Sequence, residues 1–215
     1  MSKRRSGNAS NEATVWASCA ARPLIVVAAL VPPALAILRA RLPRLSFRVV
    51  VTDRLARLGE EDVDVAIRVG PLPDSALAAR RLRRTRLVVV AAPAYLARAG
   101  TPRRPSELDA HDAITLDAPS GKPHPWRFVS GPIEVRPRVL LDHAPSLVDA
   151  LLAGLGVAQV LDFMAEGLVR AGRLVPLFVD EVVDGPPIHA VCVPGRWATA
   201  RVRAVFEAFA DAFGA

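Results

Sequence analysis

Apolar and polar positions in the first half of the chain predict strands separated by short helices. Residues 47–52 are apolar and β-branched, and residues 62–68 alternate polar with apolar side chains. Residues 86–92 form a third apolar run, which ends at Pro93. Strands separated by helices imply a parallel sheet covered on both faces, and such α/β sheets bind ligands at the carboxyl ends of their strands.

The second half of the chain shows the same alternation. Residues 126–129 and 133–136 flank a Ser-Gly-Pro segment and predict a hairpin. Ser146 is expected to start a helix, and Thr199 is expected to cap a final amphipathic helix. The whole pattern therefore predicts an α/β fold.

The region near the amino terminus has features of an export signal. Residues 23–38 are apolar and uncharged between two arginines, and a basic tail precedes them. Cys19 precedes this run, whereas the cysteine of a lipoprotein signal should follow it. The run is short for a membrane span and contains Pro32 and Pro33. We interpret it as a core helix with a kink or break at the prolines, preceded by a first strand at residues 14–17.

The net charge and the number of cysteines indicate which partners and which compartment suit the protein. The chain has 215 residues and a net charge of +7, and an excess of basic residues raises the chance of a polyanionic partner. The densest arginine cluster, residues 80–86, has no interleaved aromatic residue, so we expect it to flank a strand and face solvent. Cys19 and Cys192 are the two cysteines, which indicates a reducing, cytoplasmic environment and no disulfide framework.

Catalytic motifs are not apparent in the sequence. It shows no nucleophile elbow, no glycine-rich phosphate loop and no pair of carboxylates on one predicted face. The four histidines lack the spacing of a metal site. We therefore expect no enzymatic activity, no cofactor and no metal.

Several motifs, in order and at characteristic spacing, resemble those of one protein family. They are residues 52–58 (TDRLARL), 62–70 (DVDVAIRVG), 72–75 (LPDS), 77–82 (LAARRL), 88–96 (VVVAAPAYL), 100–102 (GTP), 153–158 (AGLGVA) and 172–176 (GRLVP). The chain resembles the effector-binding domain of LysR-type transcriptional regulators over roughly residues 14–213.

The resemblance implies a two-lobed fold similar to that of type 2 periplasmic solute-binding proteins, with two crossing strands and a small molecule in the cleft. It implies lobe one at residues 14–86 plus 190–215, lobe two at residues 88–187, and crossings at residues 87–92 and 188–193. The polar composition of residues 1–13 separately predicts a disordered tail.

The sequence departs from the family pattern in its first residues. Family members normally begin with a winged helix-turn-helix and a linker helix, whereas residues 1–13 are too short and polar to form a DNA-binding head. Three functions remain open: the sensory domain of a regulator, a solute-binding protein for transport, and a headless interaction module that forms mixed oligomers with intact regulators. The resemblance also implies a homodimer or tetramer, DNA contact only through the absent head, and no membrane association.

A ligand site is expected where helix starts and strand ends supply polar groups. Ser18 and Ser146 would add hydroxyls to helix amino termini, and Arg68 would offer a charged fork to a carboxylate. Alternatively, both serines only cap helices, or Arg68 pairs with Asp53 or Asp74. The expected ligand is a small organic acid or an aromatic metabolite. The candidate residues are Ser18, Cys19, Thr52, Arg68, Val69, Gly70, Asp117, Ser120, Ser146, Asp162 and Phe163.

Overall fold

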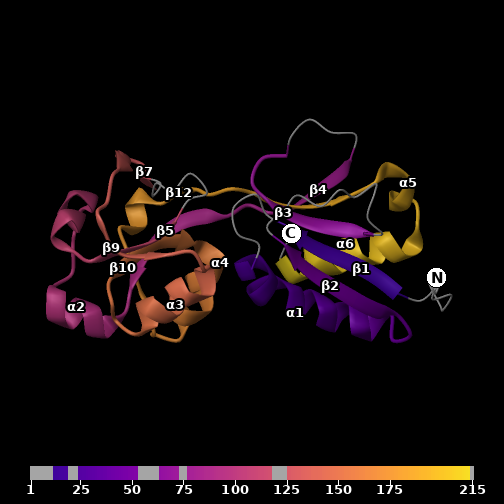
Figure 1. Ribbon diagram of the computed structural model, residues 1–215, viewed down its shortest axis with the longest axis horizontal. Helices are drawn as coiled ribbons and strands as arrows, with labels where there is room; N and C mark the ends of the chain where they lie inside the picture. The colour runs from indigo at the N-terminus through magenta and orange to yellow at the C-terminus, as the bar shows by residue number, and fades with distance from the viewer. Residues whose placement is uncertain (1–11, 19–23, 53–62, 73–76, 118–124, 214–215) are drawn as a thin grey trace, which may run out of the picture. The chain divides into compact units, whose positions relative to one another are not determined.

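The chain divides into two compact units. The computed structural model describes residues 12–18, 24–52, 63–72, 77–117 and 125–213 (Figure 1). Unit 1 comprises Met1–Arg83 and Ile188–Ala215, and unit 2 comprises Arg84–Pro187. The chain therefore leaves unit 1 once and returns once. The first described strand begins at Glu12, slightly before the predicted end of the disordered tail.

Unit 1 is built on a five-stranded sheet in the order β2-β1-β3-β13-β4. Its strands are β1 (Glu12–Ser18), β2 (Ser46–Thr52), β3 (Val65–Val69), β4 (Ala78–Arg83) and β13 (Ile188–Cys192). β1 runs parallel to β2 and β3, as predicted, but β13 runs antiparallel to both β3 and β4. The sheet is thus mixed, and the prediction of a purely parallel sheet is wrong because the returning strand enters in the opposite direction.

β4 is an edge strand that the sequence pattern did not predict. It contains Arg80, Arg81 and Arg83, and Leu82 is its only fully buried residue. The arginine cluster therefore lies within the strand and not only beside it. Charged side chains on an edge strand discourage pairing with the strands of other chains. This accounts for an arginine-rich strand at the edge of the sheet.

Two helices of unit 1 pack against each other and contact its sheet (Figure 1). They are α1 (Leu24–Arg41) and α6 (Ala200–Phe213); a short helix, α5 (Pro194–Trp197), precedes α6. α1 continues through Pro32 and Pro33, both exposed, so the predicted core helix exists without the expected break. Within the described part of the chain, no helix is long and apolar enough to cross a membrane.

Unit 2 contains a second mixed sheet in the order β11-β5-β10-β6-β9, with β12 also paired to β5. Its strands are β5 (Arg86–Ala91), β6 (Ala113–Leu116), β9 (Pro137–Leu141), β10 (Val157–Leu161), β11 (Val175–Leu177) and β12 (Val183–Asp184). Its helices are α2 (Pro93–Ala99), η1 (Pro105–Ala110), α3 (Ala144–Leu152), α4 (Asp162–Arg170) and η2 (Val179–Glu181).

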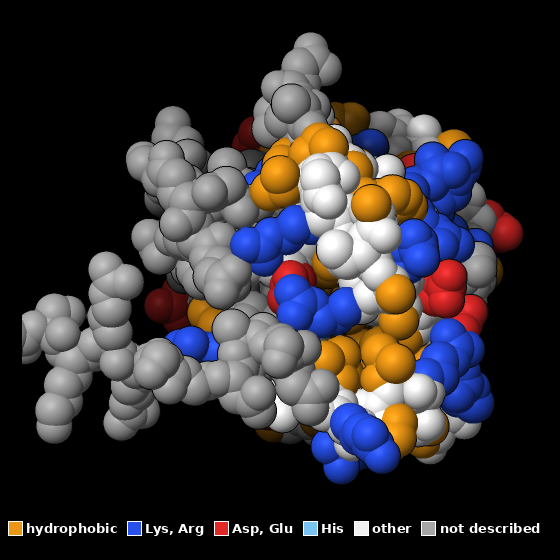
Figure 2. All heavy atoms as spheres, turned by 90° about the vertical axis from the view of Figure 1, so that its right-hand side faces the viewer, with side chains coloured by type: hydrophobic (Ala, Val, Ile, Leu, Met, Phe, Trp, Pro, Cys, Tyr) orange, Lys and Arg blue, Asp and Glu red, His pale blue; other side chains and the backbone are white. Residues whose placement is uncertain are grey.

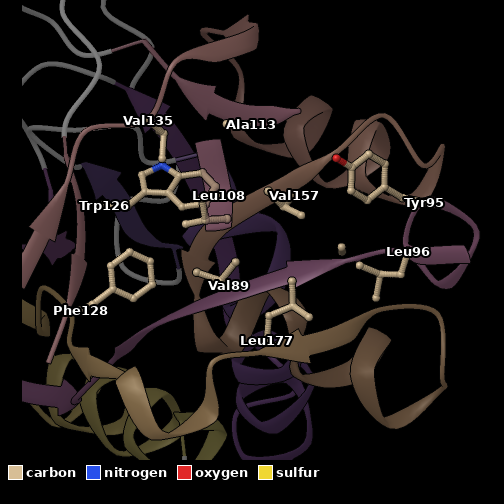
Figure 3. Packing of buried hydrophobic residues seen from close by; sticks show 11 residues of the cluster. Val89, Tyr95, Leu96, Leu108, Ala113, Trp126, Phe128, Val135, Val157 and Leu177 are labelled. Carbon is tan, nitrogen blue, oxygen red and sulfur yellow. The ribbon is translucent and has the colours of Figure 1, made fainter. Parts of the chain in front are cut away.

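Side chains from both faces of β5 form the core of unit 2. Val89 belongs to one buried cluster and Val90 to another, as the alternation of a strand requires. Figure 3 shows Leu108 and Trp126 packed near Val89 in the first cluster. Leu147 lies in the second cluster with residues of α3 and α4. A strand buried on both faces accounts for the uninterrupted apolar run in this part of the sequence.

A hairpin of β7 (Trp126–Phe128) and β8 (Gly131–Ile133) adjoins this core. Phe128 pairs with Gly131, so the turn consists of Val129 and Ser130 and not of the predicted Ser-Gly-Pro segment. Gly131 has φ of +119°, a conformation that disfavours other residues. The glycine therefore begins the second strand and does not occupy the centre of the turn.

Candidate functional site

Three predicted polar positions come to one edge of the unit 1 sheet. In the parallel register Ser18 is opposite Thr52, and Ala17 is opposite Ile67, which precedes Arg68. The carboxyl ends of β1, β2 and β3 therefore lie side by side. For Ser18 and Thr52 the structure describes the backbone only. Cys19 and Ser120 lie outside the described residues.

Arg68 is the candidate whose surroundings are best described. Its exposed fraction is 8 %, and burial lowers the pKa of its guanidinium. Arg68 is directly opposite His189 across the β3–β13 ladder, and His189 is opposite Arg81 across the β13–β4 ladder. Residues directly opposite each other in a ladder point to the same face of a sheet. A row of three basic side chains therefore crosses three neighbouring strands.

His189, the middle member of this row, is a residue that sequence reasoning did not select. Burial lowers its pKa, a hydrogen bond with the backbone of Gly70 raises it, and the positive charge of Arg81 lowers it further. Its Nδ1 is buried and has no hydrogen-bond partner among the described residues. Only the long-range pairing of β13 with β3 and β4 reveals the row, so no local sequence signal could have found it.

Gly70 and Val69 follow Arg68 at the end of the strand. Val69 pairs with Ile188, which continues the ladder toward the point where the chain returns from unit 2. Gly70 has φ of +109°, and a Cβ built there meets no atom of the described residues within 4 Å. The backbone at the strand end is therefore open, and its conformation favours glycine.

Ser146 lies in the first turn of α3, which begins at Ala144 and not at Ser146 as predicted. His143 precedes the helix, and its Nδ1 lies 2.7 Å from the Ser146 hydroxyl. No side chain caps this helix by a hydrogen bond to its backbone. The Ser146 hydroxyl is thus held by an exposed imidazole, and Pro145 removes one of the amide donors that a ligand would otherwise find.

The remaining described candidates of unit 2 follow β6 and β10. The Asp117 amide donates to the carbonyl of Leu141, while Asp117 Oδ1 is buried without a hydrogen bond among the described residues. Asp162 is the first residue of α4, and Phe163 is buried within its first turn. Both carboxylates therefore stand at carboxyl ends of strands, as predicted. Their role toward a ligand stays a prediction.

The described residues contain no group of three or more histidine, cysteine or acidic side chains that could hold a metal ion. What the site offers is positive charge, backbone amides at strand ends and hydroxyl groups. Groups of these kinds can form charge-assisted hydrogen bonds with an anion.

A comparison with known families identifies this arrangement. The family model described as "LysR substrate binding domain" matches residues 21–214. The chain belongs to this family. The family assignment made from sequence motifs is confirmed, and so is the predicted α/β fold of the two-lobed, periplasmic-binding-protein-like type.

The relatives of the chain are regulators of transcription. The chain is 30 % identical to the HTH-type transcriptional regulator CrgA of Neisseria meningitidis serogroup C, over 81 % of this chain and 59 % of CrgA. It is 31 % identical to the HTH-type transcriptional repressor PA14_22550 of Pseudomonas aeruginosa, over 84 % of this chain and 60 % of the repressor. The chain therefore spans less than two thirds of these relatives.

A solved structure supports the same assignment. The CrgA regulatory domain from Neisseria meningitidis superimposes with a TM-score of 0.83 at 27 % identity, covering 95 % of this chain and 99 % of that domain. The similarity thus extends through both units and corresponds to one regulatory domain.

Proposed function

We propose that this chain is the sensory domain of a LysR-type transcriptional regulator and that its effector is a small organic acid or an aromatic metabolite. The observation that carries the proposal is the row Arg68–His189–Arg81 beside the ends of three parallel strands. Two guanidinium groups stand on either side of a histidine whose pKa burial lowers, and a bound carboxylate is attracted to both of them. Membership of the substrate-binding family supports the same function.

The proposed ligand site of unit 1 comprises the predicted residues Ser18, Cys19, Thr52, Arg68, Val69 and Gly70 together with His189 and Arg81. Arg68 supplies the charged fork for a carboxylate, and Ser18 and Thr52 supply hydroxyls at neighbouring strand ends. The predicted residues of unit 2, namely Asp117, Ser120, Ser146, Asp162 and Phe163, stay proposed ligand-binding residues of that unit. The effector is bound and released unchanged, so no catalytic residue and no cofactor take part.

The relatives of the chain support a proposal for its location, its oligomeric state and its contact with DNA. We infer that the chain acts in the cytoplasm as a homodimer or tetramer and that DNA contact is made by a winged helix-turn-helix, as the names of its HTH-type relatives suggest. Ligand binding would then alter lobe geometry and oligomer contacts, and through them transcription. Transport is the weaker alternative, because these relatives are regulators.

A thermal-shift screen tests the proposal. Benzoate, salicylate, succinate and citrate are compared with benzamide and succinamide, which have similar shapes without the negative charge. A ligand at about 100 times its dissociation constant stabilises the folded chain by roughly 2.7 kcal/mol. Arg81→Gln should abolish the shift of every active carboxylate. Arg80→Gln is the matched control, because Arg80 is opposite Ala190 and lies on the other face of β4.

Two results would contradict the proposal. One is an equal shift with the uncharged amides, which would show that charge does not drive binding. The other is a shift that Arg81→Gln and Arg80→Gln reduce equally, which would show that the row of basic residues is not part of the site.

A further inference from the structure

A small cavity in unit 2 lies where η1 ends and the chain enters β9. Its volume is about 280 Å³, and its described lining residues are Leu108, Asp109, His111 and Arg136. Leu108 and Asp109 belong to η1, His111 follows this helix, and Arg136 precedes β9. We name this feature the η1–β9 cavity. None of its described lining residues belongs to the proposed effector site.

The inner wall of the η1–β9 cavity is anchored in the core of unit 2. Leu108 is 2 % exposed and belongs to the buried cluster in Figure 3, together with Trp126 and Val135. Val135 directly precedes Arg136, so the same cluster supports both sides of the cavity. Packed cores resist deformation, and a preformed wall lowers the entropy that a ligand loses on binding.

A chain of hydrogen bonds determines which nitrogen of His111 carries its hydrogen. The Asp112 amide donates to the Tyr95 hydroxyl at 2.8 Å, and this hydroxyl lies 3.2 Å from His111 Nδ1. Burial raises the pKa of Tyr95, so the hydroxyl keeps its own hydrogen, for which Nδ1 is the described acceptor. Neutral His111 therefore carries its hydrogen on Nε2. Among the described residues Nε2 has no hydrogen-bond partner, so one N–H donor is available to a ligand.

Asp109 and Arg136 bring opposite charges to the cavity without neutralising each other. Both residues are exposed, and in the part of the chain that the structure describes no ion pair joins them or engages either of them. The adjacent Asp112 and Arg138 behave differently, because their side chains form an ion pair at 3.1 Å. A carboxylate and a guanidinium are thus both open to a ligand in one small cavity.

The presence of a carboxylate distinguishes this cavity on a basic protein. The chain has 28 lysines and arginines against 21 acidic residues. Figure 2 shows one face of unit 1, on which basic side chains predominate over acidic ones. A simple anion therefore has many other places to bind, and nothing would direct it to a cavity that contains Asp109.

The two charges also restrict the kind of ligand. A simple anion is repelled by Asp109, a simple cation is repelled by Arg136, and an apolar molecule leaves both charges without a partner. A molecule with both a carboxylate and an ammonium group meets both charges with charge-assisted hydrogen bonds. The small volume and the single apolar lining residue suit a short side chain.

We propose that the η1–β9 cavity binds a small α-amino acid as its zwitterion, with Arg136 and His111 holding the carboxylate and Asp109 holding the ammonium group. Because both charged residues are exposed, binding is expected in the millimolar range. The site is separate from the proposed effector site, so either proposal can fail without the other.

The full chain is titrated with L-alanine, and its backbone amide shifts are followed by NMR. Propionate lacks the ammonium group of alanine, and ethylamine lacks the carboxylate, so these two probes separate the contributions of the two charges. We expect saturable shifts at residues 108–111 and 135–136 with alanine. The dissociation constant of alanine should be lower than that of either probe by about tenfold or more.

Two variants test the assigned charges. Asp109→Asn should weaken alanine binding by about tenfold or more and make propionate bind as tightly as alanine. Arg136→Gln should weaken alanine binding similarly and make ethylamine bind as tightly as alanine. This change of preference distinguishes recognition of charge from a general loss of structure. Asp180→Asn and Arg173→Gln, at exposed positions of unit 2 outside the cavity, are the matched controls and should leave binding unchanged.

Any of three results overturns the proposal. The first is the absence of saturable shifts at residues 108–111 and 135–136 with alanine, including the case in which alanine shifts only the strand ends near Arg68. The second is binding of propionate or ethylamine to the unchanged chain as tightly as alanine. The third is binding of alanine to Asp109→Asn or Arg136→Gln as tightly as to the two control variants.

Discussion

Gly156 precedes β10 at a place where the backbone of Asp112, the residue before β6, approaches it closely. A Cβ built on Gly156 would lie 2.0 Å from the carbonyl oxygen of Asp112 and 3.0 Å from its carbonyl carbon. Favourable contacts between heavy atoms lie near 3.5–4.0 Å, so the substitution Gly156→Ala forces β10 and the start of β6 apart. Asp112 resists this movement, because its amide donates to the Tyr95 hydroxyl at 2.8 Å.

Separation of the two segments also breaks a hydrogen bond. The Val157 amide donates to the Asp112 carbonyl at 2.9 Å. A buried donor left unsatisfied costs about 1–3 kcal/mol, and overpacking of a core costs a further 1–3 kcal/mol or so. We expect Gly156→Ala to lower the free energy of unfolding by about 3–5 kcal/mol, a large part of the ~5–15 kcal/mol available to a typical domain.

Two other glycines of unit 2 provide matched controls. Gly154 has φ of +71°, and a Cβ there meets its nearest atom at 3.7 Å, so Gly154→Ala should cost only about 1–2 kcal/mol of backbone strain. Gly167 lies within α4 with no neighbour in the way, so Gly167→Ala should stabilise by about 0.5–1 kcal/mol. Urea unfolding followed by circular dichroism measures all three. An effect of Gly156→Ala no larger than that of Gly154→Ala would refute the reasoning.

Three further predictions concern single side chains. Burial lowers the pKa of His189 in the folded chain relative to the unfolded chain, so the free energy of unfolding should decrease as the pH falls below about 6.5. His189→Gln should make this decrease smaller, as measured by the urea midpoints at pH 7.5 and pH 5.5. Gln159 bonds both the amide and the carbonyl of Arg127, so Gln159→Leu should speed hydrogen exchange of the Arg127 amide, whereas exchange as slow as in the parent would contradict it. Thr199 accepts from the Val202 amide, so Thr199→Ala should cost about 1 kcal/mol in urea unfolding, and Thr199→Ser should cost less.

The sequence predicted correctly those strands and helix ends that depend on residues close to one another along the chain. The apolar runs of β2, β3 and β5 gave the correct strands, and Thr199 caps α6 as expected. Gly172, with φ of +69°, follows the end of α4 in the conformation that glycine commonly adopts after a helix. In each of these cases the decisive interaction lies within a few residues along the chain.

Other features depend on partners that are far away in sequence. β4 is a strand because β13 pairs with it, although its arginines have little preference for strands on their own. His189 joins the proposed site only through the same pairing. Gly156 is required by a residue far away in sequence, because the close approach of Asp112 excludes a side chain at this position.

The order of the two units along the chain has a practical consequence. Unit 2 is one uninterrupted segment, Arg84–Pro187, and both chain termini belong to unit 1. Two junctions, at residues 83/84 and 187/188, are therefore enough to exchange unit 2 for that of a relative. Such chimaeras would show which half of the molecule dictates the choice of effector.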